Sequence, residues 1–204
     1  MGFFLHVKKQ AVIAAAVALW VPTVAFGVNV LLKYSTTPGV PGTPPPNWPI
    51  NSPIRRGNGR AALVVFVHPQ CPCSRASLGE LAIILAHTPR PLEATVFFYL
   101  PARVASDRAR TDLWRTAAAI PGVRVFEDYS ANAARTFGAH TSGQTLLYNP
   151  EGKLLFSGGI TGFRGHSGDN AGRSAILALL ETKVQEHNTS PVRTPVLGCS
   201  LIGE

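Results

Sequence analysis

Two cysteines separated by a single proline, Cys71-Pro72-Cys73, stand where an apolar run gives way to a helical pattern. Residues 61–67 are continuously apolar, as in a buried strand, and residues 74–87 carry leucine and isoleucine at helical spacing. Cys71 is therefore expected at a helix N-terminus. Free N–H groups and the helix dipole there can lower a cysteine pKa from about 8.5 to roughly 3.5–7.5. Because a thiolate is both a nucleophile and a metal ligand, the motif predicts disulfide exchange or metal binding.

Disulfide exchange requires an exposed, low-pKa attacking thiolate and a second thiol that displaces the mixed disulfide. Cys71 is predicted to attack, and Cys73 or Cys199 to resolve, with Cys73 preferred. A bridge across one proline would be strained and easily reduced, since the two Cα atoms must lie about 4.4–6.8 Å apart. His68, three residues before Cys71, is predicted to tune the thiol pKa. The alternative for the cysteine pair is an inert structural disulfide. The alternative for His68 is a structural histidine held by hydrogen bonds.

The third cysteine, Cys199, lies in a proline-containing tail beyond the last predicted helix. One hypothesis makes it a resolving or regulatory thiol folded over the site, or a third metal ligand. The other makes it an unpaired tail residue or a link to another molecule, because the cysteine count does not settle the partners.

A metal site would gather Cys71 and Cys73 with one histidine: His68, His140 or His166. Two thiolates and an imidazole suit Cu(I), whereas Zn²⁺ requires four donors. The predicted ligand set is Cys71, Cys73 and His166. Copper is therefore the metal that the sequence favours, as an alternative to redox chemistry.

The N-terminal segment, residues 1–34, contains an uncharged stretch from residue 11 to 32, close to the roughly 20 residues that span a bilayer as a helix. Lys8 and Lys9 precede it, so the positive-inside rule leaves the N-terminus in the cytoplasm and exports the rest of the chain, to the periplasm in a bacterium. A cleaved signal peptide is the alternative, but the stretch is long and lacks a convincing cleavage site. An uncleaved membrane anchor is the preferred interpretation.

Residues 35–58 are rich in proline and glycine and are predicted to form a semi-rigid linker. Strands and helices then alternate through residues 59–187, and a tail of residues 188–204 follows. The predicted strands are 61–67, 92–99, 123–126, 145–148 and 153–157, and the predicted helices are 74–87, 107–120, 130–137 and 172–187. A turn signal at 149–152 joins the last two strands. This pattern predicts an α/β domain with a mixed sheet covered on both faces.

The formal net charge of +8 does not indicate nucleic-acid binding, because the basic residues are dispersed and lack aromatic interleaving. The glycine-rich segment 158–172 lacks the registered phosphate-binding fingerprints, so nucleotide binding is not expected. It would precede the last helix, where Arg164 or His166 could approach the cysteines. The alternative is that segment 158–172 is a surface turn without a function.

The chain resembles the thioredoxin-like superfamily, and within it the membrane-anchored, exported thiol–disulfide oxidoreductases. Their active-site segment reads C-P-x-C-R before a helix ending in E-L, and CPCSRASLGEL at 71–81 aligns with it without a gap. The segment 144–153 is similar to their strand-turn-strand hairpin. The resemblance covers about residues 60–187. It implies a thioredoxin-like fold and thiol–disulfide exchange with protein or small-molecule thiols. The expected partner is a protein thiol or disulfide substrate or an electron donor, and no cofactor is expected beyond the redox disulfide.

Two departures from the family pattern stand out. The family's second cysteine falls on Ser74, and its cis-proline falls on Gly143. By resemblance, Pro72, Ser142 and Gly143 form the loops that face the substrate. In the family the proline keeps metal away from the cysteines, and exported copper chaperones share the fold. The resemblance therefore implies an oxidoreductase, with a copper-binding protein as the alternative.

Overall fold

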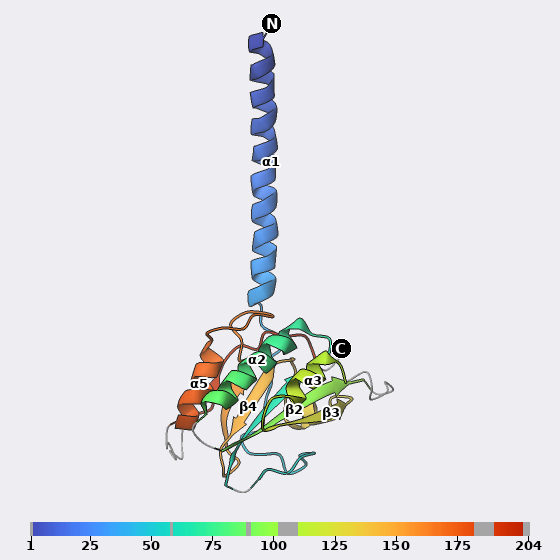
Figure 1. The fold of residues 1–204 in the computed structure, drawn as a ribbon, viewed down its shortest axis with the longest axis vertical. Coiled ribbons are helices and arrows are strands. Elements are labelled where there is room, and N and C mark those ends of the chain that lie inside the picture. Colours follow the sequence, from blue (N-terminus) through green and yellow to red (C-terminus); the bar gives the residue numbers. More distant parts are fainter. Residues whose placement is uncertain (1, 58, 89–90, 102–109, 182–189, 202–204) are drawn as a thin grey trace. The chain divides into compact units, whose positions relative to one another are not determined.

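The computed structural model describes residues 2–57, 59–88, 91–101, 110–181 and 190–201 (Figure 1). The chain divides into two compact units, residues 1–37 and residues 38–204. The first unit is the helix α1 (Gly2–Thr36), and the second is an α/β domain.

Helix α1 contains one segment, Lys9–Thr36, that is long and apolar enough to cross a membrane. Its 28 residues exceed the roughly 20 that a bilayer requires. Pro22 lies inside the helix without ending it. Length and composition fit a membrane anchor, and they fit a signal sequence equally.

The domain is built on one mixed six-stranded sheet with the strand order β3-β2-β1-β4-β5-β6. The strands are β1 (Ala61–Val67), β2 (Leu92–Leu100), β3 (Val123–Tyr129), β4 (Gln144–Tyr148), β5 (Leu154–Gly158) and β6 (Val192–Arg193). Strands β1, β2 and β3 run parallel, β4 is antiparallel to β1 and β5, and β6 is parallel to β5. The central strand β1 is the one that leads into the cysteine motif.

One face of the sheet packs against α2 (Pro72–His87), α3 (Asp112–Ala118) and α5 (Ala171–Glu181) (Figure 1). Alternate residues of β1, Leu63, Val65 and Val67, point to this face and are fully buried. Leucine and isoleucine side chains of the three helices pack on them: Leu78, Leu81, Ile84, Leu113, Ile176 and Leu180.

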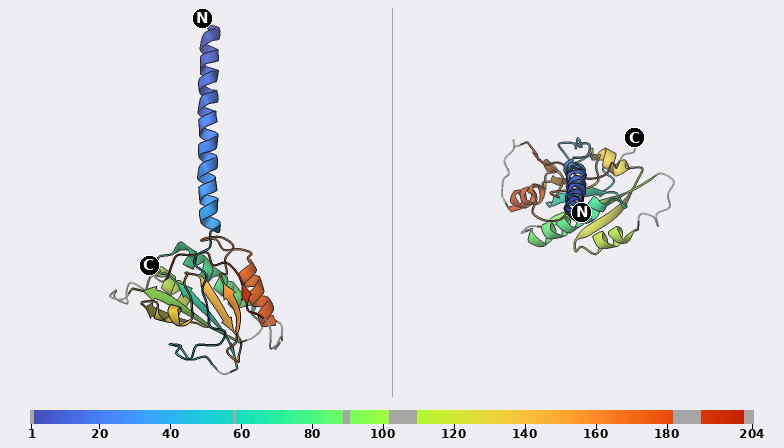
Figure 2. Two further views of the ribbon diagram at one scale, coloured as in Figure 1. Left: turned by 180° about the vertical axis from the view of Figure 1, so that it is seen from behind. Right: turned by 90° about the horizontal axis from the view of Figure 1, so that it is seen from above.

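The opposite face, seen from behind in Figure 2, buries Val64 and Phe66 of β1. Helix α4 (Asn132–Thr136) packs on this face. Trp48 of the proline-rich segment also contacts it, with ring centroids 5.1 Å from Phe137 and 5.2 Å from Tyr148. The core therefore has two layers, one on each side of the sheet.

The proline-rich segment was expected to act as a spacer, but it contacts the domain instead. The backbone N–H of Thr43 donates to Gly138, that of Trp48 to Gly152, and that of Leu154 to Pro46. Proline has a fixed φ and no backbone N–H, so a proline-rich segment favours an extended conformation. The polar backbone groups that remain in this segment pair with the domain. The boundaries 1–34, 35–58, 59–187 and 188–204 stay a prediction.

The fold class predicted from the sequence is confirmed: a mixed sheet flanked by helices follows one apolar N-terminal helix. Strand β1 has the predicted bounds, and α2 starts two residues earlier, at Pro72. The predicted helix start near residue 107 and the helix end at 182–187 lie outside the described residues. The short strand β6 was not predicted, because two residues carry no periodicity.

Candidate active site

The site begins where β1 ends and α2 starts, at the centre of the sheet. Cys71 is the N-cap residue of α2, with an extended backbone (φ −85°, ψ 123°), and Pro72 occupies the first turn. Proline is favoured there because its fixed φ matches the helix and its missing N–H is not needed. A turn closed by the N–H of Cys71 donating to the carbonyl of His68 (3.1 Å) places the cysteine at this junction.

All three cysteines of the chain meet at this junction, and all three carry free thiols. The Sγ atoms of Cys71 and Cys199 lie 2.7 Å apart, although the two residues are 128 positions apart in sequence. Cys73 also hydrogen-bonds through its side chain to Cys71. Cys71 is only 2% exposed, in contrast to the accessible thiolate that the sequence led us to expect.

The two neighbouring thiols govern the ionisation of Cys71. The S–H of Cys73 is the largest cause that lowers the pKa of Cys71, to about 4. Burial opposes this shift, while the S–H of Cys199 and the backbone N–H groups of both neighbours support it. The helix N-terminus therefore positions the sulfur, and neighbouring S–H groups join the backbone N–H groups in stabilising its thiolate.

The same hydrogen bonds keep the other two sulfurs protonated. Hydrogen bonding to Cys71, followed by burial, raises the pKa of Cys73 far above its ordinary value. Burial, followed by hydrogen bonding to Cys71, raises the pKa of Cys199 to about 11. The resting site therefore holds one thiolate that accepts hydrogen bonds from two thiols.

Residues 190–201 form a C-terminal strap that brings Cys199 to the site. The strap begins with β6 at the sheet edge, and the carbonyl of Val196 accepts from the N–H of Gly39 (2.8 Å). The carbonyl of Cys199 then accepts from the N–H of Ser142 (2.8 Å), and the N–H of Leu201 donates to His140 (2.9 Å). These bonds hold the strap over Cys71.

Arg164 fixes the strap from the glycine-rich segment. Its Nη1 donates to the carbonyl of Gly198 (2.7 Å), the residue before Cys199. Its positive charge lowers the pKa of Cys199 and of Cys73, against the larger opposing effects. Gly198 has no room for a side chain, because a Cβ there would lie 1.9 Å from the carbonyl oxygen of Ser142. The expected approach of Arg164 to the cysteines is thus observed.

His68 is held by its backbone and by an aromatic neighbour. Its backbone N–H donates to Oγ of Ser142 (2.9 Å), and its imidazole ring stacks on the ring of Tyr99 with centroids 5.4 Å apart. Burial lowers the pKa of His68, and the Cys71 thiolate opposes this shift only in part. The imidazole is therefore neutral at neutral pH, so its charge contributes little to the thiolate there.

Ser74, where the family has its second cysteine, is fully buried. Its Oγ donates to the carbonyl of His68 (2.8 Å) and lies 3.0 Å from Oγ of Ser142. Gly143, where the family has its cis-proline, has a φ of +90°, and its N–H donates to Phe66 (2.7 Å). A left-handed φ excludes proline. Ser142 and Gly143, predicted to face a substrate, lie beneath the strap in this structure.

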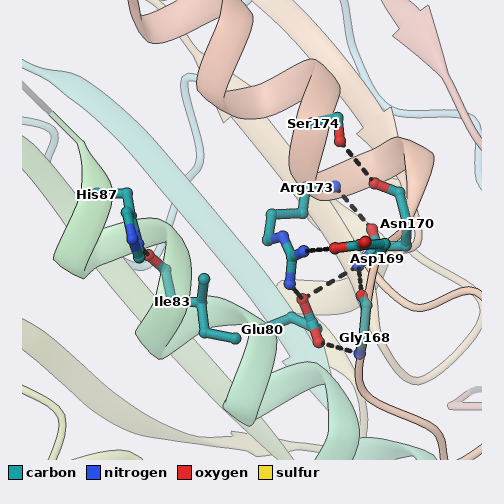
Figure 3. A network of polar contacts seen from close by, with 8 residues as sticks. All are labelled: Glu80, Ile83, His87, Gly168, Asp169, Asn170, Arg173 and Ser174. Carbon is teal, nitrogen blue, oxygen red and sulfur yellow. Dashed lines mark hydrogen bonds and ion pairs between the residues drawn. The ribbon is translucent and has the colours of Figure 1, made fainter.

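A buried carboxylate, which sequence reasoning did not single out, ties the glycine-rich segment to α2 (Figure 3). Glu80 is fully buried and accepts from the N–H of Gly168 (2.7 Å), Nδ2 of Asn170 (3.1 Å) and Nη1 of Arg173 (2.5 Å). In the sequence it is the glutamate of the E-L pair that ends the segment 71–81, and it lies on the apolar side of an otherwise hydrophobic helix. The network holds in place the segment that carries Arg164.

The predicted metal set does not assemble. Within the part of the chain that the structure describes, no group of three or more histidine, cysteine or acidic side chains is arranged to hold a metal ion. His166 is exposed and places its Nδ1 2.8 Å from the carbonyl of Arg164. The structure thus brings Cys71, Cys73, Cys199 and Arg164 together and leaves His166 outside.

No family model matches the sequence, and no curated protein matches it. An uncharacterized conserved protein from Geobacillus kaustophilus is similar in structure, with a TM-score of 0.55 and 15% identity, covering 83% of this chain and 95% of its own. A hypothetical protein from Sinorhizobium meliloti 1021 also has a TM-score of 0.55, with 19% identity and coverages of 82% and 96%. These similarities show the fold alone.

At a lower TM-score of 0.44, the pneumococcal exposed lipoprotein thioredoxin from Streptococcus pneumoniae has 19% identity and covers 60% of this chain and 84% of its own.

Proposed function

We propose that this chain is a membrane-tethered thiol–disulfide oxidoreductase that acts outside the cytoplasm on protein or small-molecule thiols. The observation that carries the proposal is the pairing of free thiols at the N-cap of α2, where Sγ of Cys71 lies 2.7 Å from Sγ of Cys199. The surrounding side-chain and backbone donors lower the pKa of Cys71 to about 4. A thiolate is the attacking species in disulfide exchange, and a neighbouring thiol is what completes the exchange. The site combines both in one place.

Cys71 acts as the nucleophile in this proposal. Its sulfur attacks one sulfur of a substrate disulfide, a mixed disulfide forms, and the other substrate sulfur leaves as a thiolate. His68 and Ser142 act as positioning residues, because the hydrogen bond between them fixes the turn that carries Cys71. The two neighbouring thiols stabilise the attacking thiolate.

Turnover of a fluorogenic disulfide peptide by the full-length, detergent-solubilised protein, with dithiothreitol as electron donor, tests this proposal. We expect Cys71→Ser to abolish turnover, because it removes the nucleophile. Glu151→Gln, at the exposed hairpin turn, is the matched control and should keep wild-type turnover. Equal turnover by the wild type and Cys71→Ser would refute the proposed function.

The N-terminal helix supports the proposed location. Its segment Lys9–Thr36 is long enough to anchor the chain, and Lys8 and Lys9 precede the uncharged stretch. We expect the protein to stay in the membrane pellet after an alkaline wash and its domain to be digested by protease added to spheroplasts. A domain that is protected from the protease would place it in the cytoplasm and refute this orientation.

Copper binding is a second candidate. The observation that favours it is the pair of adjacent sulfurs of Cys71 and Cys199, because soft thiolates are ligands that Cu(I) prefers. Titration with Cu(I) under anaerobic, reducing conditions tests it. Stoichiometric binding that is lost in Cys71→Ser supports a copper-handling role, and the absence of retained metal refutes it.

A further inference from the structure

We propose that Cys199, on the C-terminal strap, is the resolving thiol of this site, and that the redox-active disulfide joins Cys71 to Cys199. This inference rests on the proposed function and assigns the second thiol of the reaction. Cys73 then takes no part in the disulfide and stays reduced.

The first argument is the placement of the two sulfurs. At 2.7 Å, the Sγ atoms of Cys71 and Cys199 are closer than two non-bonded thiols normally lie and a short step from a disulfide bond of about 2.05 Å. The two sulfurs need to approach each other by only about 0.65 Å to reach bonding distance. The two residues are 128 positions apart in sequence, so the contact results from the fold rather than from neighbouring positions in the sequence.

The second argument is the way the strap holds Cys199 from both sides. Thr141 and Ser200 form an antiparallel β-bridge, with one hydrogen bond at Cys199 and one at Leu201. Leu201 is buried in the core, and Arg164 holds the carbonyl of Gly198. A cysteine fixed so closely beside the nucleophile gains the rate advantage of an oriented intramolecular reactant.

The third argument concerns the restraints on Cys73. Pro72 fixes the backbone between Cys71 and Cys73, and Cys73 belongs to the first turn of α2. Its carbonyl accepts from Oγ of Ser77 (3.2 Å), within the same helix. A disulfide across one residue would have to distort this helix start to reach the required torsion. The sulfur of Cys199, by contrast, already lies 2.7 Å from that of Cys71 and comes from a separate segment of the chain.

The reaction then balances as follows. The Cys71 thiolate attacks a disulfide R–S–S–R′, the Cys71–S–S–R bond forms, and R′S⁻ leaves. Cys199 gives its proton to R′S⁻, and its thiolate attacks the Cys71 sulfur, so that RS⁻ leaves and the Cys71–Cys199 disulfide forms. Two electrons pass from the two cysteines to the substrate. A dithiol from the surroundings then reduces the Cys71–Cys199 disulfide and restores the starting form. When the pair acts as an oxidant, this dithiol belongs to the protein that is oxidised.

Reaction of the reduced full-length protein with one equivalent of dithiobis(nitrobenzoate), a chromogenic disulfide, tests the assignment. We expect the wild type and Cys73→Ser to release both thionitrobenzoate groups and to yield a Cys71–Cys199 disulfide by peptide mass spectrometry. Cys199→Ser should release the first group and retain the second on Cys71 as a stable mass adduct. Serine is nearly isosteric with cysteine, so Cys73→Ser and Cys199→Ser form a matched pair.

The outcomes separate the inference from the proposed function. If Cys73→Ser retains the adduct and Cys199→Ser releases both groups, Cys73 resolves and the inference fails, while the oxidoreductase remains. If Cys71→Ser releases both groups as the wild type does, the proposed function itself fails. Should Cys199→Ser fold poorly by circular dichroism, the disulfide map of the wild type decides: a Cys71–Cys73 bridge overturns the inference.

Discussion

If Cys73 serves as a hydrogen-bond donor, its removal must raise the pKa of Cys71. The S–H of Cys73 is the largest cause that lowers this pKa to about 4. A hydrogen bond to a charged group contributes about 1.5–3 kcal/mol. At about 1.36 kcal/mol per pKa unit, this corresponds to about one to two units. We therefore expect Cys73→Ala to raise the pKa of Cys71 to about 5–6.

Cys73→Ser is the control, because a hydroxyl keeps a donor at the same position. It should leave the pKa of Cys71 closer to the wild-type value than Cys73→Ala does. The thiolate absorbs in the ultraviolet, so a pH titration of the absorbance measures the pKa directly. A Cys71 pKa that does not change in Cys73→Ala, or that rises equally in both variants, refutes the hydrogen-bond argument.

Two further predictions follow from the same geometry. Because the folded-state pKa of Cys71 is depressed to about 4, its thiolate is lost only as the pH falls through that value. The rate of its reaction with a small disulfide, measured by stopped flow, should therefore be nearly independent of pH between about 5 and 8. The rate for a free thiol, by comparison, rises roughly tenfold per pH unit below about 8.5. Glu80→Gln should lower the free energy of unfolding by about 3 kcal/mol in a denaturant titration, because it removes the buried one of the two carboxylates that pair with the largely buried Arg173. The control Asp169→Asn, which removes an exposed partner of the same arginine, should cost less than about 1 kcal/mol.

The junction of β1 and α2 could be predicted because its signals are local. The apolar run 61–67 and the helical spacing after Pro72 each fit one element, so the position of Cys71 at a helix N-terminus followed from neighbouring residues alone. The alternation of strands and helices gave the mixed sheet in the same way. Within these segments, short-range patterns and tertiary packing favour the same structure.

The sequence left the position of Cys199 open between a thiol folded over the site and an unpaired tail residue, because that position depends on backbone pairing between distant segments. Nothing in the composition of the strap indicates that the carbonyl of Cys199 pairs with Ser142 rather than with solvent. The position of Trp48 likewise depends on distant residues, because the fold brings the rings of Phe137 and Tyr148 next to it. Glycine at 198 was one usable signal, since it permits close contact with another backbone segment.

The ionisation of Cys71 also affects the redox potential of the Cys71–Cys199 pair. Stabilising the thiolate stabilises the reduced form of the pair, which makes its disulfide a stronger oxidant. A pKa of about 4 lies about three units below neutral pH, and about 30 mV per unit gives an upward shift of up to about 90 mV in the two-electron potential. We therefore expect the Cys71–Cys199 pair to have a potential well above the roughly −300 mV of stable secreted disulfides. Equilibration with glutathione buffers measures it, and Cys73→Ala should lower it, because that variant removes the main donor to the thiolate. A wild-type potential at or below −300 mV would identify the bridge as structural and refute an oxidising role.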